Sequence, residues 1–343
     1  MKKSLYAAIA ACLMLSMNCS CDKTSSEGNE NTDPEEVGTA TIYTTTADQK
    51  MTFNKTELPF QTIPGMMDNI VTISDAKKYQ TIDGFGAAIT GSTCHNLLKM
   101  TKDNRTKFLK EMFDMNEGLG VSLIRVSIGS SDFGLDEYTW CDEKGIENFG
   151  INKWDKDEVI PILHEIYAIN PNVKIIASPW SAPRWMKTNG KWTSGELKTD
   201  CYQDYATYFV KWIQTMEKEG FNIYAMTIQN EPLNRGNSMS MYMSWQEQRN
   251  FIKKALGPAF EQNNIKTKIL LFDHNYNYDD IADQRSYPLN IYADAEASKY
   301  VSGSAWHNYG GNVNELVTIA SKAPEKEIYF TEASIGTWNY KYQ

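Results

Sequence analysis

The sequence predicts an α/β protein with the architecture of a (β/α)8 TIM barrel, of which about seven of the eight strands are present. Two observations lead to this expectation. Short apolar strand candidates alternate with longer amphipathic helix candidates along most of the chain, as in a parallel sheet covered by helices. Polar residues also gather where the strand candidates end, and in such a barrel these ends face the active site.

The strand candidates are short runs rich in Val, Ile and aromatic residues. They cover Ile82–Ile89, Val121–Ile128, Val173–Pro179, Tyr224–Gln229, Ile269–Asp273, Val301–Trp306 and Glu327–Thr331. An open doubly wound sheet usually carries a Gly-rich phosphate loop after its first strand. Gly84-Phe85-Gly86 lacks the third glycine of that fingerprint, so we interpret it as tight backbone packing and favour the barrel.

Helix candidates lie between these strands. They include Lys99–Met115, Asp155–Ile169 and Asp200–Glu219. In the last of them four aromatic residues share one face at helical spacing: Tyr205, Tyr208, Phe209 and Trp212. Such a stripe predicts packing against a sheet rather than a binding site.

The N-terminus has the features of an export signal. Lys2 and Lys3 precede the apolar run Leu5–Met17, which has signal-peptide length and is too short to span a membrane. We therefore expect residues 1–21 to be a signal peptide.

Lipidation at the end of this signal is the expected anchor. Cys21 is the favoured site and Cys19 the second, while an ordinary cleaved secretory signal is the alternative. Residues 22–40, rich in Ser, Asn, Gly and acidic residues, predict a flexible tether. The expected location is the surface or the periplasmic side of a bacterial outer membrane, and secretion is the alternative.

Composition excludes several classes of partner. The net charge is −9 and no Lys/Arg-rich run is present, so nucleic acid and anionic membrane surfaces are poor partners, and a lipid anchor would be the only membrane contact. Beyond the signal, Cys94, Cys141 and Cys201 have no metal-ligand spacing. We expect no metal and no cofactor.

Two glutamates at strand ends suggest a hydrolytic site. Asn230-Glu231-Pro232 follows one strand candidate, and Thr331-Glu332-Ala333 ends another. The barrel would bring both carboxyl groups to the same mouth. A carboxyl pair suits glycoside hydrolysis, since one group protonates the departing oxygen while the other attacks the anomeric carbon or activates water. Asn230 is placed to bind a sugar 2-hydroxyl.

Six phrases of the sequence resemble a known enzyme family. They are Gln80–Thr90, Ile124–Val126, Ser131–Phe133, Ala177–Pro183, Gln229–Pro232 and Phe330–Ala333, and they run in the family's order from about residue 78 to the end. Together they resemble glycoside hydrolase family 30, which contains β-1,6-glucanases and glucosylceramidases. A single Asn-Glu-Pro occurs in many glycosidases, whereas the joint set is specific.

The resemblance implies catalytic roles at four positions. Glu231 matches the family's acid/base and Glu332 its nucleophile. Asn230 matches the ligand of the 2-hydroxyl. Arg125 matches an arginine that supports the nucleophile, and a buried ion-pairing arginine is the structural alternative.

Four further residues are implied to bind substrate. Asp132 and Trp180 match residues that hold the distal hydroxyls of the sugar, although Trp180 could also be a core residue. Tyr309 matches a tyrosine that contacts the nucleophile. His307 is either in the cleft or an unrelated polar loop residue. Asp273 and His274 have only a strand-end position to support them.

Family members continue past the nucleophile into an eighth strand and a β-sandwich built from both chain ends. The resemblance therefore implies that residues 41–77, which include the β-like pieces Thr41–Thr45 and Ile70–Ile73, form a partial β-sandwich segment. Residues 78–343 are then expected to be the catalytic barrel, incomplete at its C-terminus.

The leading functional hypothesis is a retaining endo-β-1,6-glucanase that acts on extracellular glucan. The first alternative is a glucosylceramidase, for which the loop Lys187–Lys198 is more polar than a lipid substrate needs. The second is a catalytically inactive glycan-binding surface lipoprotein, against which the two glutamates argue.

Overall fold

The computed structural model describes residues 38–60, 72, 74–276 and 281–334. They belong to two compact units, Met1–Gln80 and Thr81–Gln343. The expected signal, Cys21 and residues 22–37 of the tether lie outside the described residues, as does most of Ile70–Ile73. Within the described ranges, no helix is both long and apolar enough to cross a bilayer.

The smaller unit contains one antiparallel hairpin. Its strands are β1 (Thr39–Thr44) and β2 (Asn54–Pro59), and Thr39 pairs with Pro59 while Thr44 pairs with Asn54. The first strand agrees with the β-like piece expected at Thr41–Thr45, and the second was not expected. The β-sandwich assignment of residues 41–77 stays a prediction.

The larger unit is a seven-stranded parallel sheet with the strands in sequence order, β3 to β9. The strands are β3 (Gly86–Ala88), β4 (Leu123–Ser127), β5 (Lys174–Ser178), β6 (Ile223–Thr227), β7 (Lys268–Asn275), β8 (Val301–His307) and β9 (Glu327–Glu332). In the described part of the chain no pairing joins β9 to β3, so the sheet is an incomplete TIM barrel. The predicted fold class is confirmed.

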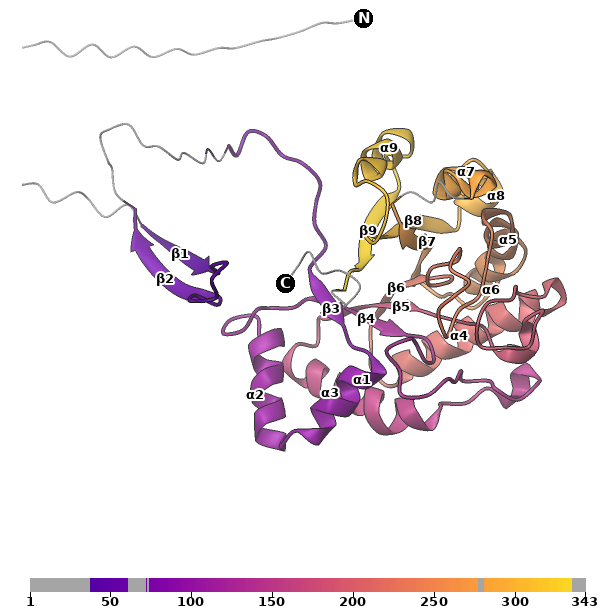
Figure 1. Ribbon diagram of the computed structural model, residues 1–343, viewed down its shortest axis with the longest axis horizontal. Coiled ribbons are helices and arrows are strands. Elements are labelled where there is room, and N and C mark those ends of the chain that lie inside the picture. Colours follow the sequence, from indigo (N-terminus) through magenta and orange to yellow (C-terminus); the bar gives the residue numbers. More distant parts are fainter. Residues whose placement is uncertain (1–37, 61–71, 73, 277–280, 335–343) are drawn as a thin grey trace, which may run out of the picture. The chain divides into compact units, whose positions relative to one another are not determined.

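Helices connect the strands and lie around the outside of this sheet (Figure 1). They are α1 (Gly91–Lys99), α2 (Lys102–Phe113), α3 (Ile160–Ile169), α4 (Tyr202–Lys218), α5 (Trp245–Phe251), α6 (Gly257–Gln262), α7 (Tyr287–Tyr292), α8 (Ala295–Ser298) and α9 (Asn314–Lys322). The helix expected over Lys99–Met115 begins later because Thr101 caps α2, with its hydroxyl accepting from the backbone N–H of Asn104.

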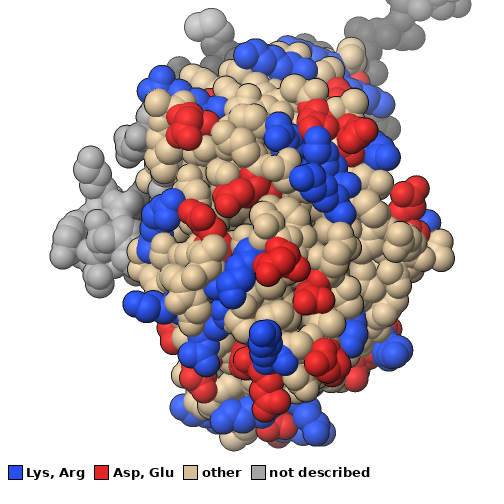
Figure 2. Space-filling view, turned by 90° about the vertical axis from the view of Figure 1, so that its right-hand side faces the viewer, with Lys and Arg blue, Asp and Glu red and all other residues tan. Residues whose placement is uncertain are grey.

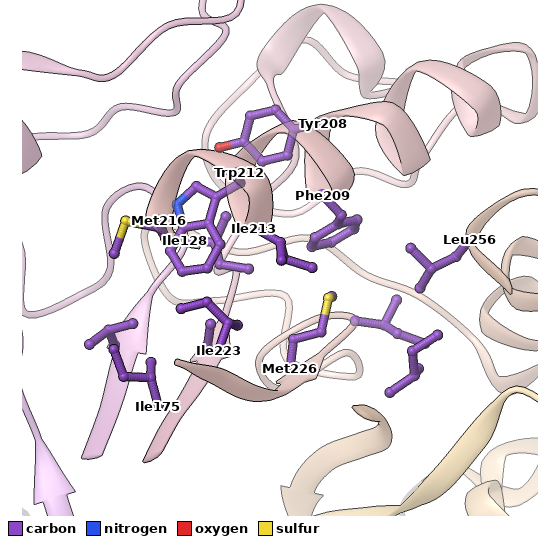
Figure 3. Packing of buried hydrophobic residues seen from close by; sticks show 14 of the residues in the cluster. Ile128, Ile175, Tyr208, Phe209, Trp212, Ile213, Met216, Ile223, Met226 and Leu256 are labelled. Atoms are coloured by element: carbon purple, nitrogen blue, oxygen red, sulfur yellow. The ribbon is translucent and has the colours of Figure 1, made fainter. Parts of the chain in front are cut away.

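The core lies between the sheet and these helices. The aromatic stripe of α4 is buried, and Trp212 and Ile213 lie near Ile175 and Ile223 of the sheet (Figure 3). Burial of each such side chain away from water contributes about 1.5–3 kcal/mol to the stability of the fold. The stripe therefore packs as expected, and its burial holds β5 and β6 in place beneath the site.

The first strand of the sheet is shorter than expected. Only Gly86–Ala88 pairs with β4, and Gly84 has a φ of 153° that a side chain would disfavour. A Cβ at Gly86 would lie 1.3 Å from the carbonyl oxygen of Leu123. The interpretation of Gly84-Phe85-Gly86 as tight backbone packing is therefore confirmed.

Candidate active site

Polar side chains from five strands of the sheet meet at its carboxyl end. β4 supplies Arg125, the residues just after β6 supply Asn230 and Glu231, β7 supplies Asp273, β8 supplies His307 and β9 supplies Glu332. These six residues form one hydrogen-bonded network. The parallel order of the strands places their ends side by side, so residues remote in the chain become neighbours.

Arg125 is the cation at the centre of this network. It is buried, and Nη1 donates to Glu332 Oε2 at 2.7 Å while Nη2 donates to Asn230 Oδ1 and Asp273 Oδ2, both at 2.8 Å. Burial disfavours the guanidinium, but the charges of Asp273 and Glu332 outweigh it and raise the pKa of Arg125. Arg125 therefore fixes the Glu332 carboxylate and orients the amide of Asn230.

Asp273 is the buried anion of the network. Its Oδ1 faces His307 Nε2 at 3.0 Å and accepts from the Thr331 hydroxyl at 2.6 Å. Its Oδ2 accepts from Arg125 and from two hydroxyls, those of Ser178 and Thr227. Burial alone would raise the pKa of Asp273, but Arg125 and His307 hold it well below its usual range.

The backbone around Asp273 departs from regular strand geometry. Phe272 and Asp273 have φ values of 70° and 63°, and the register between β7 and β8 shifts at this point. A bulge of this kind redirects a side chain within a sheet. Glu231 also lies in the left-handed region, with φ of 43°. Such strain persists only where the surroundings impose it, and it clusters at functional sites.

His307 links Asp273 to Glu231. Its Nδ1 lies 3.1 Å from Glu231 Oε1 and 3.9 Å from Glu332 Oε1. Burial alone would lower the pKa of His307, but the hydrogen bonds to Asp273 and Glu231 outweigh it and raise that pKa to about 9. His307 therefore lies at the end of β8 within this network rather than in an unrelated loop, and it carries a proton at neutral pH.

Glu231 is correspondingly held as a carboxylate. Burial alone would raise its pKa, but the hydrogen bond from His307 and the nearby His274 lower the pKa of Glu231 to about 2. Asn234 Nδ2 donates to Glu231 Oε2 at 2.8 Å. Glu231 and His307 therefore share one proton across a short hydrogen bond, and their titrations are coupled.

The two glutamates face each other. One ligand atom each from Glu231, His307 and Glu332 lies within 4.8 Å of the others. Such a spacing could hold a metal ion, but both ring nitrogens of His307 are engaged by carboxylates and its pKa is raised. The expected absence of a metal stays a prediction.

The other expected substrate ligands surround this centre. The Trp180 ring lies 4.9 Å from the Arg125 guanidinium carbon, and its buried Nε1 has no hydrogen-bond partner among the described residues. The Tyr309 hydroxyl donates to Ser334 Oγ at 3.2 Å. Burial and the charge of Glu332 raise the pKa of Tyr309 to about 12.

Asp132 is the outermost expected ligand. It is solvent-exposed and lies in the turn that follows β4. Partial desolvation, followed by the charges of Glu332 and Glu231, raises the pKa of Asp132 to about 6. Asp132 therefore lies within electrostatic reach of both glutamates without joining their network.

Sequence reasoning underrated Asp273 and did not single out the hydroxyls that surround it. Its strand-end position was a correct signal, but it did not distinguish Asp273 from other strand-end residues. Thr227 and Thr331, at the ends of neighbouring strands, could have been found by asking which hydroxyls would face a buried carboxylate.

Comparison with known proteins identifies the family. Residues 82–343 match the model of the glycosyl hydrolase family 30 TIM-barrel domain. The chain belongs to glycoside hydrolase family 30. The solved endo-β-1,6-glucanase BT3312 is 55% identical with a TM-score of 0.83, over 88% of this chain and 66% of that one.

Curated relatives of two activities are also similar. An endo-1,6-β-D-glucanase of Neurospora crassa is 33% identical over 76% of this chain and 56% of its own length. The lysosomal acid glucosylceramidase of Mus musculus is 32% identical over 70% of this chain and 48% of its own length. The family 30 chain described here thus spans about half the length of the curated relatives it matches.

The surface of this family 30 chain carries charges of both signs. On the face shown in Figure 2, Lys and Arg are interspersed with Asp and Glu. This mixture agrees with the expectation from net charge that the surface is not built for a polyanion.

Proposed function

We propose that this chain is a retaining β-glycoside hydrolase that cleaves β-1,6-glucan, with Glu332 as nucleophile and Glu231 as acid/base. The observation that carries the proposal is the distance between the two glutamates, whose nearest oxygens lie within 4.8 Å. Retaining enzymes hold their carboxyl groups about 5–5.5 Å apart, whereas inverting enzymes leave about 6.5–9.5 Å for a water molecule.

Glu332 is suited to attack because Arg125 holds its carboxylate in one orientation. The ion pair at 2.7 Å fixes one carboxylate oxygen. The other oxygen is left to attack the anomeric carbon. Asn230, oriented by the same guanidinium, would hold the 2-hydroxyl of the attacked sugar.

Glu231 is suited to acid/base work through its partner His307. Glu231 and His307 together hold one proton between them at neutral pH. Substrate that displaces water from the cleft would favour the neutral form of the Glu231 carboxyl group. The proton then passes from His307 Nδ1 to Glu231 and on to the departing oxygen. After departure, the Glu231 carboxylate can take a proton from the incoming water.

Trp180, Asp132 and Tyr309 complete the sugar pocket in this proposal. The buried Trp180 Nε1 donor would gain a partner when a sugar hydroxyl binds. Asp132, whose pKa is raised to about 6, would accept from a distal hydroxyl.

The glucanase activity is favoured over the glucosylceramidase activity by similarity. The solved relative at 55% identity is an endo-β-1,6-glucanase, whereas the lysosomal glucosylceramidase is 32% identical. The substrate would then be an extracellular glucan. We further propose export with a lipid at Cys21, on the basis of the N-terminal pattern alone.

The test is hydrolysis of linear β-1,6-glucan, β-1,3-glucan, β-1,4-glucan and a glucosylceramide, with NMR detection of the first anomer released. We expect activity on the β-1,6-glucan and initial release of the β-anomer. An α-anomer would contradict the role of Glu332, and preference for the ceramide would reverse the substrate assignment. Binding without hydrolysis would instead favour a glycan-binding protein.

A further inference from the structure

Lys187 is a buried lysine in the loop that follows β5. Only 1% of the residue is exposed, and Nζ donates to Ser181 Oγ at 2.8 Å, Trp192 O at 3.0 Å and Ser240 O at 2.7 Å. An ammonium group has three N–H donors, so these neutral oxygens match it fully. Burial lowers the pKa of Lys187 to about 7, which means that holding a cation here costs free energy.

The three acceptors come from two different loops. Ser181 and Trp192 belong to the loop after β5, and Ser240 belongs to the loop after β6. The same loops are joined by backbone hydrogen bonds from Ser240 N to Trp192 O at 3.0 Å and from Tyr242 N to Gly195 O at 2.8 Å. We call residues 186–198 and 240–243 the loop layer. Lys187 belongs to the first of these two segments, and its buried ammonium group ties the segments together.

Aromatic rings with guanidinium partners lie on the loop layer. The Arg184 guanidinium carbon is 4.9 Å from the centre of the Trp192 ring, and that of Arg235 is 3.6 Å from the Tyr242 ring. Both aromatic residues are partly exposed. Flat rings beside charged donors suit a pyranose, whose apolar face can stack while its hydroxyls reach the charges.

The loop layer is connected to the site through Glu231. Glu231 lies near the start of the loop after β6, Asn234 donates to its carboxylate, and Met243 N donates to Pro232 O to close the loop. If Glu231 protonates the departing oxygen, the loop that leaves it borders the departing part of the glycan. This step rests on the proposed function.

We propose that Lys187 is a positioning residue that holds the loop layer as the wall of the leaving-group side of the cleft, where the departing glucan unit binds. Without its three hydrogen bonds, the loops after β5 and β6 keep their backbone hydrogen bonds to each other but lose their shared buried anchor, and Trp192 is held less firmly. A sugar on this side would then bind more weakly, both as leaving group and as acceptor.

Transfer to an added sugar isolates this side of the cleft. In a retaining enzyme, water or an acceptor sugar can attack the glycosyl-enzyme, and the acceptor binds where the leaving group was. A dinitrophenyl β-glucoside would be the donor, because its leaving group is not a sugar, and a β-1,6-linked glucose disaccharide would be the acceptor. The ratio of transfer to hydrolysis within one variant is independent of its overall rate.

We expect Lys187→Met to lower this ratio roughly tenfold, which corresponds to a loss of about 1.4 kcal/mol in the binding free energy of the acceptor. The matched control is Lys191→Met, an exposed lysine of the same loop, which should leave the ratio unchanged. Ser181→Ala removes one of the three acceptors, and it should lower the ratio to a smaller extent with an unfolding midpoint near that of wild type.

If folded Lys187→Met keeps the wild-type ratio of transfer to hydrolysis, the proposal is overturned. If Lys187→Met does not fold, an unchanged ratio in Ser181→Ala overturns it. Wild-type protein that cleaves neither the aryl glucoside nor the glucan would overturn the proposed function instead. The two failures are therefore distinguishable.

Discussion

Replacing Asp273 by Asn keeps the shape of the side chain and removes the buried anion of the site. The two oxygens of Asp273 receive five hydrogen bonds, from Arg125, Ser178, Thr227, Thr331 and His307. An amide has one oxygen, and the oxygen must face the guanidinium because arginine has no acceptor. The NH2 group then faces His307. Breaking a buried ion pair by removing one partner costs about 3–5 kcal/mol.

The pH dependence of this cost follows from His307. Its folded pKa is about 9 against an ordinary value of 6.5, so its charged form stabilises the fold. This contribution, roughly 3 kcal/mol, is fully present below the unfolded pKa and is lost as pH rises through the folded pKa. In Asp273→Asn the pKa of His307 falls, so the variant should be most destabilised in acid and less so above about pH 9.

The assay is urea unfolding of wild type and Asp273→Asn at about pH 6 and about pH 9.5, on either side of the titration. Asp103→Asn, an exposed carboxylate in the first turn of α2, is the matched control and should cost under about 1 kcal/mol at both pH values. An equal cost of Asp273→Asn at both pH values would refute the reasoning, because His307 would then not depend on Asp273.

Three further predictions test the site, the sheet and the N-terminus. Azide should rescue Glu231→Ala by attacking the glycosyl-enzyme intermediate, which gives a β-glycosyl azide. It should rescue Glu332→Ala by direct displacement, which gives an α-glycosyl azide. If the two anomers were exchanged, the roles of the two glutamates would be reversed. Gly86→Ala should cost about 1–3 kcal/mol in chemical unfolding because its Cβ would meet a strand carbonyl at 1.3 Å, whereas Gly150→Ala, with open space around it, should be nearly neutral. Full-length protein should partition into detergent and Cys21→Ala should not; equal partitioning would remove the lipid anchor.

Much of the sheet was predictable because parallel strands are buried on both faces and leave continuous apolar runs. β4, β5 and β8 lie within one or two residues of the predicted ends. β3 was predicted too long, since an apolar run does not tell which of its residues pair with a neighbour.

The site was predictable only in part. Arg125, Glu231 and Glu332 could be placed because strand order alone brings their strand ends together. The importance of Asp273 depends on a bulge, and bulges have no strong sequence pattern. The sequence shows Lys187 only as part of a polar loop, because nothing in it indicates that the ammonium group is enclosed by carbonyl and hydroxyl oxygens.

The hydrogen bond between Arg125 and Glu332 joins residues 207 positions apart in the chain. A contact of this separation closes a very long loop, and such contacts form late because the chain entropy is lost before they contribute. Glu332 thus reaches its guanidinium partner only when the strands between them are ordered. During refolding, recovery of the proposed hydrolase activity should therefore lag behind recovery of helical circular dichroism, so that turnover reports the last step of assembly.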